Sequence, residues 1–250
     1  MPLVETDWLG MNLNKVKIID CSWHMPQTRR NGLEEYKKQH IPNSIFFDLD
    51  ENSKKNTKLP HMLVQEEDWN NIVSKMGINN TDKVVIYDNS DVISSCRLWF
   101  NLIYFGHNAK LVHVLNGGFQ KWLSENKRVT DQVSRIDNSN YKSLEKKELV
   151  KDKIMIDKNL DVQDFKIIDA RSKDRFHGKI PEPREGLRSG SIRNSFCIPF
   201  NTCLNEDRTF KKKSELEKIF KECLKDLNEK NIVFSCGSGV TACVLALAYS

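Results

Sequence analysis

The feature that most constrains the fold is an internal repeat. The tetrapeptide Lys-Ile-Ile-Asp occurs at residues 17–20 and again at residues 166–169. In each half it is followed by two further apolar segments, at 40–47 and 84–88 in the first half and at 190–199 and 232–236 in the second. Short apolar segments alternating with helical patterns are typical of parallel α/β units, and a ~145-residue period predicts two copies of one domain. We therefore expect an α/β chain of two tandem domains, each a parallel sheet flanked by helices.

The composition changes between the two copies. Residues 129–150 are polar, rich in Asn, Ser and Lys, and show no sustained periodicity, which is typical of a linker. At 250 residues the chain is long enough for two modest domains. We therefore predict an N-terminal domain over 1–128, a linker over 129–150 and a C-terminal domain over 151–250. The Lys-rich stretch 210–230 has apolar residues at helical spacing and predicts an ordinary amphipathic helix.

A cysteine stands at the end of the last predicted strand. Cys236 follows the apolar run 232–235 and opens the loop Gly237-Ser238-Gly239-Val240-Thr241, which leads into a helix-like segment. The N–H groups of such a loop and the N-terminus of the helix point toward the sulfur and favour the thiolate over the thiol. The alternative is a buried structural cysteine, which is the commoner case for a lone cysteine in an apolar strand. The two glycines favour the reactive thiolate, because they let the backbone curl around one atom.

The residues around this loop exclude two other chemistries. A cysteine phosphatase needs an arginine that closes the loop on the phosphate dianion, whereas residues 242–244 are Ala, Cys and Val. Cys236 and Cys243 lack the short pairing and the second cluster of a zinc site, so no metal is expected. In the first copy Asp88 occupies the place of Cys236. We therefore expect the nucleophile only in the second domain.

Composition also limits the setting and the partners. The seven cysteines are an odd number scattered through predicted strands and helices, which is typical of free thiols and predicts a cytoplasmic protein. The net charge of +5 comes from 39 basic and 34 acidic residues spread along the chain, so no nucleic-acid partner is expected. This charge suits an anionic small substrate. No apolar run approaches the ~20 residues of a membrane span, and residues 1–9 show no leader pattern.

Several stretches resemble the two-domain rhodanese family, and the resemblance runs along nearly the whole chain. They lie at residues 20–23, 40–50, 61–63, 115–122, 169–171, 175–178 and 182–190. The most specific are Arg-Phe-His-Gly at 175–178 and Glu-Pro-Arg-Glu-Gly-Leu-Arg-Ser-Gly at 182–190. The resemblance implies two rhodanese-like domains and a sulfurtransferase whose cysteine carries the transferred sulfur as a persulfide.

The resemblance also implies how the substrate is held. Arg175 and Arg184 match the clamps that the family uses for a substrate carboxylate and carbonyl, and Arg188 is a further candidate. Without the resemblance these arginines would be read as surface ion-pair partners. A guanidinium fork matches a planar carboxylate, so the pair could fix an α-keto acid with its thiol facing the cysteine. The loop residues are expected to hold the substrate sulfur and the persulfide with their N–H groups: Gly237, Gly239, Val240 and Thr241.

A proton relay is implied as well. The members of the family that use mercaptopyruvate have a Ser-His-Asp relay, which maps onto Ser238, His61 and Asp50. Taken alone, His61 would be a solvated loop histidine and Asp50 a turn or cap residue. The relay requires a cleft between the two domains.

The implied reaction moves sulfur from 3-mercaptopyruvate to Cys236, releases pyruvate and passes the sulfur to an acceptor such as thioredoxin, a small dithiol or cyanide. No organic cofactor is implied. Gly-Ser-Gly after the cysteine is the pattern of mercaptopyruvate-using members, whereas thiosulfate-using members carry Arg and Lys there. A thiosulfate sulfurtransferase remains one alternative, and a non-catalytic binding module of the same fold is another.

Two departures from the family pattern bear on these expectations. Asp88 is followed by 34 residues up to Trp122, whereas 14 residues follow Cys236, so we expect the second domain to lack about twenty residues that carry a strand. The absent strand would leave unpaired backbone groups in the sheet. At residues 190–194 the chain reads Gly-Ser-Ile-Arg-Asn where the family prefers Gly-His-Ile-Pro-Gly, which predicts a local difference in the turn.

Overall fold

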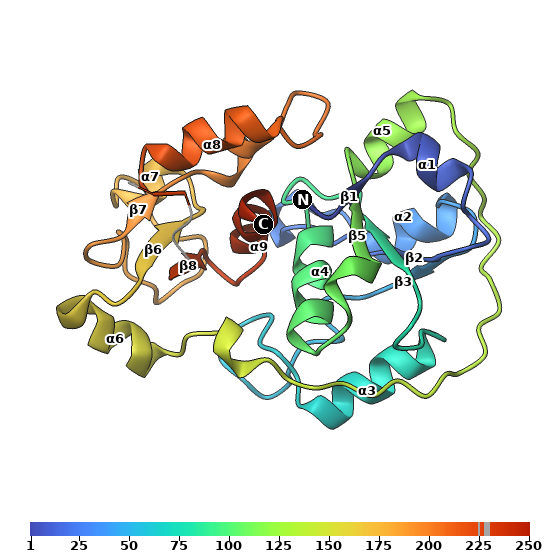
Figure 1. Cartoon of the computed structure of the whole chain (residues 1–250), viewed down its shortest axis with the longest axis horizontal. Helices are drawn as coiled ribbons and strands as arrows, with labels where there is room; N and C mark the ends of the chain where they lie inside the picture. Colours follow the sequence, from blue (N-terminus) through green and yellow to red (C-terminus); the bar gives the residue numbers. More distant parts are fainter. Residues whose placement is uncertain (225, 228–230) are drawn as a thin grey trace. The chain divides into compact units, whose positions relative to one another are not determined.

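A computed structural model describes residues 1–224, 226–227 and 231–250, and these residues form two compact units (Figure 1). The first unit is Met1–Lys147 with Glu206–Thr209, and the second is Glu148–Asn205 with Phe210–Ser250. Each unit contains one sheet whose strands all pair in parallel. The predicted α/β architecture of two tandem domains is confirmed.

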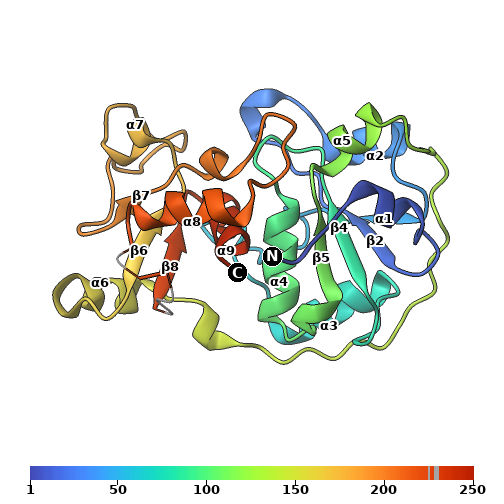
Figure 2. The same cartoon turned by 45° about the horizontal axis from the view of Figure 1, so that its top comes forward.

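The first unit is a five-stranded sheet with helices on both faces. Its strand order is β1-β5-β4-β2-β3. The strands and helices are β1 (Leu3–Val4), α1 (Thr6–Gly10), β2 (Lys17–Asp20), α2 (Gly32–Lys38), β3 (Ser44–Phe46), α3 (Glu66–Lys75), β4 (Val84–Tyr87), α4 (Ser95–Tyr104), β5 (Val112–Leu115) and α5 (Gly118–Ser124). The sheet separates α1, α2 and α5 from α3 and α4 (Figure 1), and Figure 2 shows α4 beside β4 and β5.

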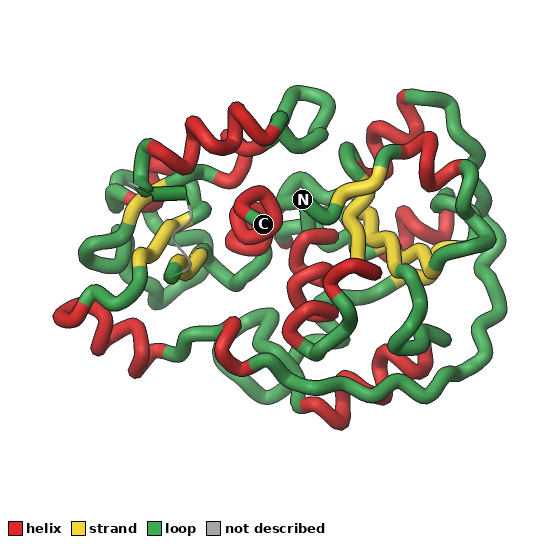
Figure 3. The backbone as a smooth tube through the Cα atoms, viewed as in Figure 1, coloured by secondary structure: helices red, strands yellow, loops and turns green. Residues whose placement is uncertain are grey.

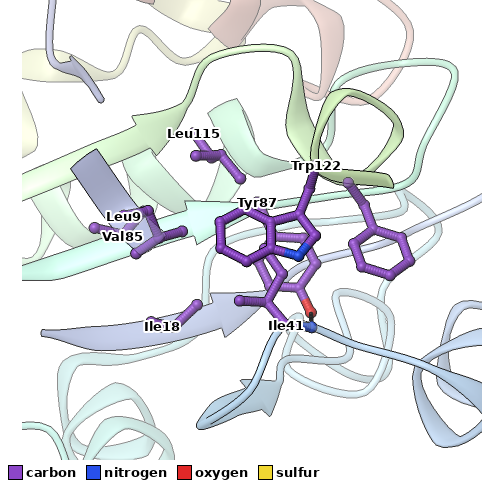
Figure 4. Close-up of a cluster of buried hydrophobic side chains, with 8 residues drawn as sticks. Leu9, Ile18, Ile41, Val85, Tyr87, Leu115 and Trp122 are labelled. Carbon is purple, nitrogen blue, oxygen red and sulfur yellow. Dashed lines mark hydrogen bonds between the residues drawn. The ribbon is translucent and has the colours of Figure 1, made fainter. Parts of the chain in front are cut away.

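The core of this unit forms because its central strands are apolar on both faces. All four residues of β4 are buried, as expected for a strand covered by helices on each side. Side chains alternate across a sheet, so Val85 and Tyr87 of β4 share one face, where they pack with Trp122 of α5 (Figure 4). The Tyr87 hydroxyl accepts a hydrogen bond from the Ile41 backbone N–H at 3.2 Å. The buried phenol therefore keeps a polar partner inside an apolar cluster.

The predicted linker is largely part of the first unit. Residues 131–146 contain no helix or strand (Figure 3), in agreement with their lack of periodicity. Thr130 nevertheless forms an antiparallel bridge with His40, and Ser139 Oγ donates to the Ile78 carbonyl at 2.5 Å. Tyr141 is 1% exposed. The first unit thus extends to Lys147, beyond the boundary predicted at residue 128.

The second unit is a smaller sheet in the order β7-β6-β8. Its strands and helices are α6 (Lys153–Val162), β6 (Lys166–Asp169), α7 (Lys173–Phe176), β7 (Phe196–Cys197), α8 (Lys213–Lys221), β8 (Ile232–Ser235) and α9 (Thr241–Tyr249). An aromatic trio joins α8, β8 and α9, with ring centroids of Phe220 and Tyr249 5.0 Å apart and those of Phe234 and Tyr249 6.0 Å apart. The helix predicted within 210–230 is present as α8, while positions 225 and 228–230 of that prediction lie outside the described residues.

Strand register makes the two units directly comparable. Asp20 pairs with Tyr87 between β2 and β4, and Asp169 pairs with Ser235 between β6 and β8. The residue after each partner is Asp88 in one unit and Cys236 in the other, so the predicted equivalence of these two residues is confirmed. In the described part of the second unit β8 pairs with β6 alone, whereas β4 pairs with both β2 and β5.

The turns before β3 and β7 share one backbone feature. Ile19 pairs with Ile45, and Ile168 pairs with Phe196, so register makes Asn43 equivalent to Asn194. Both asparagines adopt the left-handed conformation, with φ of +67° and +62°. Asparagine tolerates this region better than most residues. The two turns are therefore alike at this position, and the predicted difference of residues 190–194 from the family pattern stays a prediction.

Candidate active site

Cys236 lies at the carboxyl end of β8, and the loop that follows turns back on its sulfur. The Gly239 backbone N–H donates to Cys236 Sγ at 3.1 Å. Gly239 has a φ of +78°, a conformation that glycine adopts without strain. Cys243 Sγ donates to the Gly239 carbonyl at 3.0 Å, which ties the loop to the first turn of α9. Of the loop N–H groups expected to face the sulfur, that of Gly239 does so, while Val240 is buried and Thr241 begins the helix.

Two of the three predicted arginines lie at this loop. A β-carbon placed on Gly237 would be 3.3 Å from Arg175 Nη2, so that guanidinium lies against the residue after the cysteine. Arg184 Nη2 donates to the Gly237 carbonyl. Arg188 instead donates to the Ser191 carbonyl at 3.2 Å. The structure therefore brings Arg175 and Arg184 together at Cys236 and gives Arg188 a partner away from the loop.

A buried carboxylate behind the arginines was not singled out from the sequence. Glu182 accepts from Arg175 Nε at 3.1 Å and Nη2 at 2.5 Å, and from Arg171 Nη1 at 2.8 Å. Its side chain is 4% exposed, and the hydrogen bond from Arg175 is the largest cause that lowers the pKa of its carboxyl. The signal was available, because Glu182 opens the segment 182–190 that carried the family resemblance.

In the first unit, two of the predicted relay residues are hydrogen-bonded to each other. His61 Nε2 and Asp50 Oδ1 are 2.9 Å apart, and Trp23 Nε1–H donates to Asp50 Oδ2 at 2.9 Å. The hydrogen bond with His61 is the largest cause that lowers the pKa of Asp50. The His61 side chain is 3% exposed, so the solvated loop histidine expected without the resemblance is wrong. Ser238 belongs to the second unit, and its partnership with His61 stays a prediction.

Asp88 occupies the corresponding place at the end of β4. Its Oδ1 accepts from the Ser90 N–H at 2.8 Å and its Oδ2 from the Ser95 N–H at 2.9 Å, at the start of α4. Asp88 is 4% exposed, and burial raises the pKa of its carboxyl. In the first unit the hydrogen-bond acceptor at this position is thus the Asp88 carboxyl group, where the second unit has a thiol.

The described residues contain no group of three or more His, Cys, Asp or Glu side chains that could hold a metal ion. None of the seven cysteines forms a disulfide. Cys236 opens the loop, Cys243 donates a hydrogen bond to it, and the other five lie elsewhere. In the same part of the chain, every helix is too short or too polar to span a bilayer.

Comparison with known proteins identifies the domains and their relatives. The model of the Rhodanese-like domain matches residues 5–125 and 152–249. Thiosulfate/3-mercaptopyruvate sulfurtransferase 1, mitochondrial, of Arabidopsis thaliana is 38% identical over 270 residues, which cover 98% of this chain and 70% of that protein. The 3-mercaptopyruvate sulfurtransferase of Mus musculus is 34% identical and covers 98% of this chain and 84% of its own length. The solved structure of SseA from Escherichia coli, a 3-mercaptopyruvate sulfotransferase, is 29% identical with a TM-score of 0.89 over 99% of this chain and 93% of that one.

Proposed function

The chain belongs to the rhodanese-like family and is a sulfurtransferase, and from this premise we propose that it takes the sulfur of 3-mercaptopyruvate onto Cys236. The observation that carries the proposal is the loop after β8. There the Gly239 N–H points at Cys236 Sγ, and Arg175 and Arg184 contact the adjacent Gly237. The proposed nucleophile and a donor for developing negative charge therefore lie within one short loop. Two cations that could bind a substrate carboxylate lie beside that loop.

The proposed first step is attack of the Cys236 thiolate on the substrate sulfur. A sulfur–sulfur bond forms, the carbon–sulfur bond breaks, and its electron pair leaves with the carbon as the enolate of pyruvate, which then takes up a proton. The loop N–H groups stabilise negative charge on sulfur. Arg175 and Arg184 hold the carboxylate and carbonyl so that the thiol faces Cys236.

A relay of Ser238, His61 and Asp50 would remove the proton of the substrate thiol. The hydrogen bond between Asp50 Oδ1 and His61 Nε2 fixes the orientation of the ring, which is the role of the acid in a Ser-His-Asp triad. In the second step an acceptor takes the outer sulfur from the persulfide. We infer a thiol acceptor such as thioredoxin or a small dithiol, with cyanide as a laboratory substitute, and a cytoplasmic setting in which the seven free thiols stay reduced.

Thiosulfate is the second candidate donor, because the Arabidopsis thaliana relative carries both substrates in its name. The loop argues for mercaptopyruvate. Thiosulfate is a dianion that benefits from cations in the loop, and here Gly237 and Ser238 stand where such cations would be.

The test is donor-dependent turnover by the purified chain. Pyruvate release from 3-mercaptopyruvate and thiocyanate formation from thiosulfate with cyanide are measured side by side. We expect Cys236→Ser to lower pyruvate release by about a thousandfold or more, because it removes the nucleophile. Cys223→Ser, which changes another partly exposed cysteine of the same unit, should leave the rate unchanged.

Three results would count against the proposal. A higher kcat/KM for thiosulfate would reassign the donor, and full activity in Cys236→Ser would reassign the nucleophile. Folded protein without turnover on either donor would favour a binding module of the same fold.

A further inference from the structure

Glu182 has an enclosed acidic side chain near the cysteine loop, 4% exposed, and it is shared by two arginines. Both of its oxygens accept from Arg175, and one of them also accepts from Arg171. Arg171 in turn binds Asp169 at the end of β6 through Nε and Nη2. The chain Asp169-Arg171-Glu182-Arg175 therefore anchors the last guanidinium to the end of a central strand.

These contacts fix which edge of Arg175 faces the loop. The Nε–Nη2 edge is occupied by Glu182, and within the described residues Arg175 Nη1 makes no hydrogen bond. Nη2 also lies 3.3 Å from the place of a Gly237 β-carbon. A guanidinium is planar and its donors are fixed in the plane, so holding one edge sets the direction of the other. The Nη1–Nη2 edge is left to bind a second carboxylate beside Cys236.

The charges of these four linked side chains cancel. Two carboxylates, Asp169 and Glu182, stand against two guanidinium groups, Arg171 and Arg175. Arg175 therefore offers a substrate its geometry more than net charge, and Arg184 at the Gly237 carbonyl supplies a further cation. Such a site suits a monoanion better than a dianion, because the two carboxylates already balance the charges of Arg171 and Arg175.

We propose that Glu182 is a positioning residue that holds Arg175 so that its open edge binds the planar carboxylate of the sulfur donor beside Cys236. The inference deepens the proposed function and rests on it, since the carboxylate is that of mercaptopyruvate. It makes Glu182 a determinant of the preference for an α-keto acid over thiosulfate.

Neutralising Glu182 should weaken the binding of a planar carboxylate, whereas a simple charge effect would strengthen it. Removing a negative charge near the loop strengthens the attraction for any anion, whereas releasing Arg175 weakens binding of a planar carboxylate. Glu182→Gln separates the two effects because it removes the charge at nearly constant size. Glu185→Gln is the matched control, since Glu185 is exposed, lies three residues away and undergoes the same change of charge.

Bromopyruvate is the probe, because it carries the same planar carboxylate and alkylates a thiol without any turnover. Its concentration for half-maximal alkylation of Cys236 is measured by mass spectrometry of the peptide, with Cys236→Ser as the blank. We expect about a tenfold increase in Glu182→Gln, equivalent to about 1.4 kcal/mol, and no change in Glu185→Gln. Alkylation by neutral iodoacetamide should be unchanged in both variants, which reports an intact loop.

An unchanged or lower half-saturating concentration in Glu182→Gln overturns the proposal. If that variant does not fold, Glu182→Asp replaces it: the charge is kept, but the side chain is one methylene shorter and cannot reach both arginines, so the same increase is expected. In turnover, KM for mercaptopyruvate should rise with kcat little changed, and kcat/KM for thiosulfate should not fall. An equal loss for both donors also refutes the proposal.

The two ideas can fail separately. Absence of turnover by the wild-type chain refutes the proposed function, while the bromopyruvate measurement still decides what Glu182 does for a planar carboxylate.

Discussion

Replacing Asp20 with asparagine tests how the first unit tolerates a buried acid. Asp20 ends β2 and is 3% exposed; its Oδ1 accepts from the Ser22 N–H at 2.9 Å and from the Ser22 hydroxyl at 2.5 Å. Desolvation is the largest cause acting on it, and it raises the pKa of the carboxyl to about 7 from 3.8. Asparagine keeps an oxygen for Ser22 and has no proton to lose in this range.

The pKa sets both the sign and the size of the effect. The folded state binds this proton more tightly than the unfolded chain, so the contribution to stability is fully present below about pH 4 and is lost as the pH rises to about 7. A tenfold change in an ionisation constant corresponds to about 1.4 kcal/mol, so the complete loss is about 4 kcal/mol. Between pH 5 and pH 8 the wild type should lose about 2.5 kcal/mol relative to Asp20→Asn.

Urea unfolding followed by tryptophan fluorescence measures this difference. All five tryptophans lie before residue 123, so the signal reports the first unit, and the second does not obscure the transition. Exposed Asp131→Asn is the control and should follow the wild type at every pH. Groups such as Glu35, whose pKa is lowered, make the opposite contribution to stability and cancel in the comparison. Parallel pH profiles for wild type and Asp20→Asn would refute the buried-acid argument.

Two further substitutions test the packing of each unit. Gly118→Ala should lower the free energy of unfolding of the first unit by about 2 kcal/mol, because Gly118 has a φ of +57° and a β-carbon there would lie 2.6 Å from the Asp88 carbonyl. Gly10→Ala, whose β-carbon would meet its nearest atom at 3.9 Å, should cost far less, and equal fluorescence-detected losses would contradict the steric reasoning. Tyr249→Phe should lower the stability of the second unit by about 1 kcal/mol, because the hydroxyl donates to the Leu227 carbonyl at 2.7 Å. Circular dichroism measures this loss, and an unchanged transition would mean that water replaces the bond.

Much of the fold followed from the sequence because its signals are local. The segments predicted as strands at 17–20, 166–169 and 232–235 are β2, β6 and β8. Each is a short apolar run that ends at a polar residue. The last three residues of β2 and of β6 are buried, as expected for strands covered on both faces, whereas the residues of β8 are half-buried. The longer segment 190–199 yielded only the two residues of β7, which begins two residues after the left-handed Asn194. Periodicity alone does not mark such a turn.

The site was predictable only where it is local. The contact between Gly239 and Cys236 spans three residues, and a glycine-rich loop after a strand indicated it. Glu182 contacts Arg171 in the loop after β6 and Arg175 in α7. The segment 182–190 pointed to Glu182 itself, but the sequence does not show that one acid binds both arginines. The Trp23–Asp50 hydrogen bond likewise joins residues far apart in the sequence. The family resemblance indicated the arginines and the relay residues. Only the structure shows that Glu182 holds Arg175 and that Trp23 holds Asp50.

The two units place different side chains at the same point of one fold. Register places Asp88 and Cys236 at the same point after equivalent strands. A carboxylate has two oxygens, and Asp88 uses both to accept from backbone N–H groups, those of Ser90 in the loop and Ser95 at the start of α4. The same kind of donor is offered to the single sulfur of Cys236 by Gly239. The donors of the first loop are therefore occupied by its own side chain, and this is why the proposed nucleophile is assigned to the second unit alone.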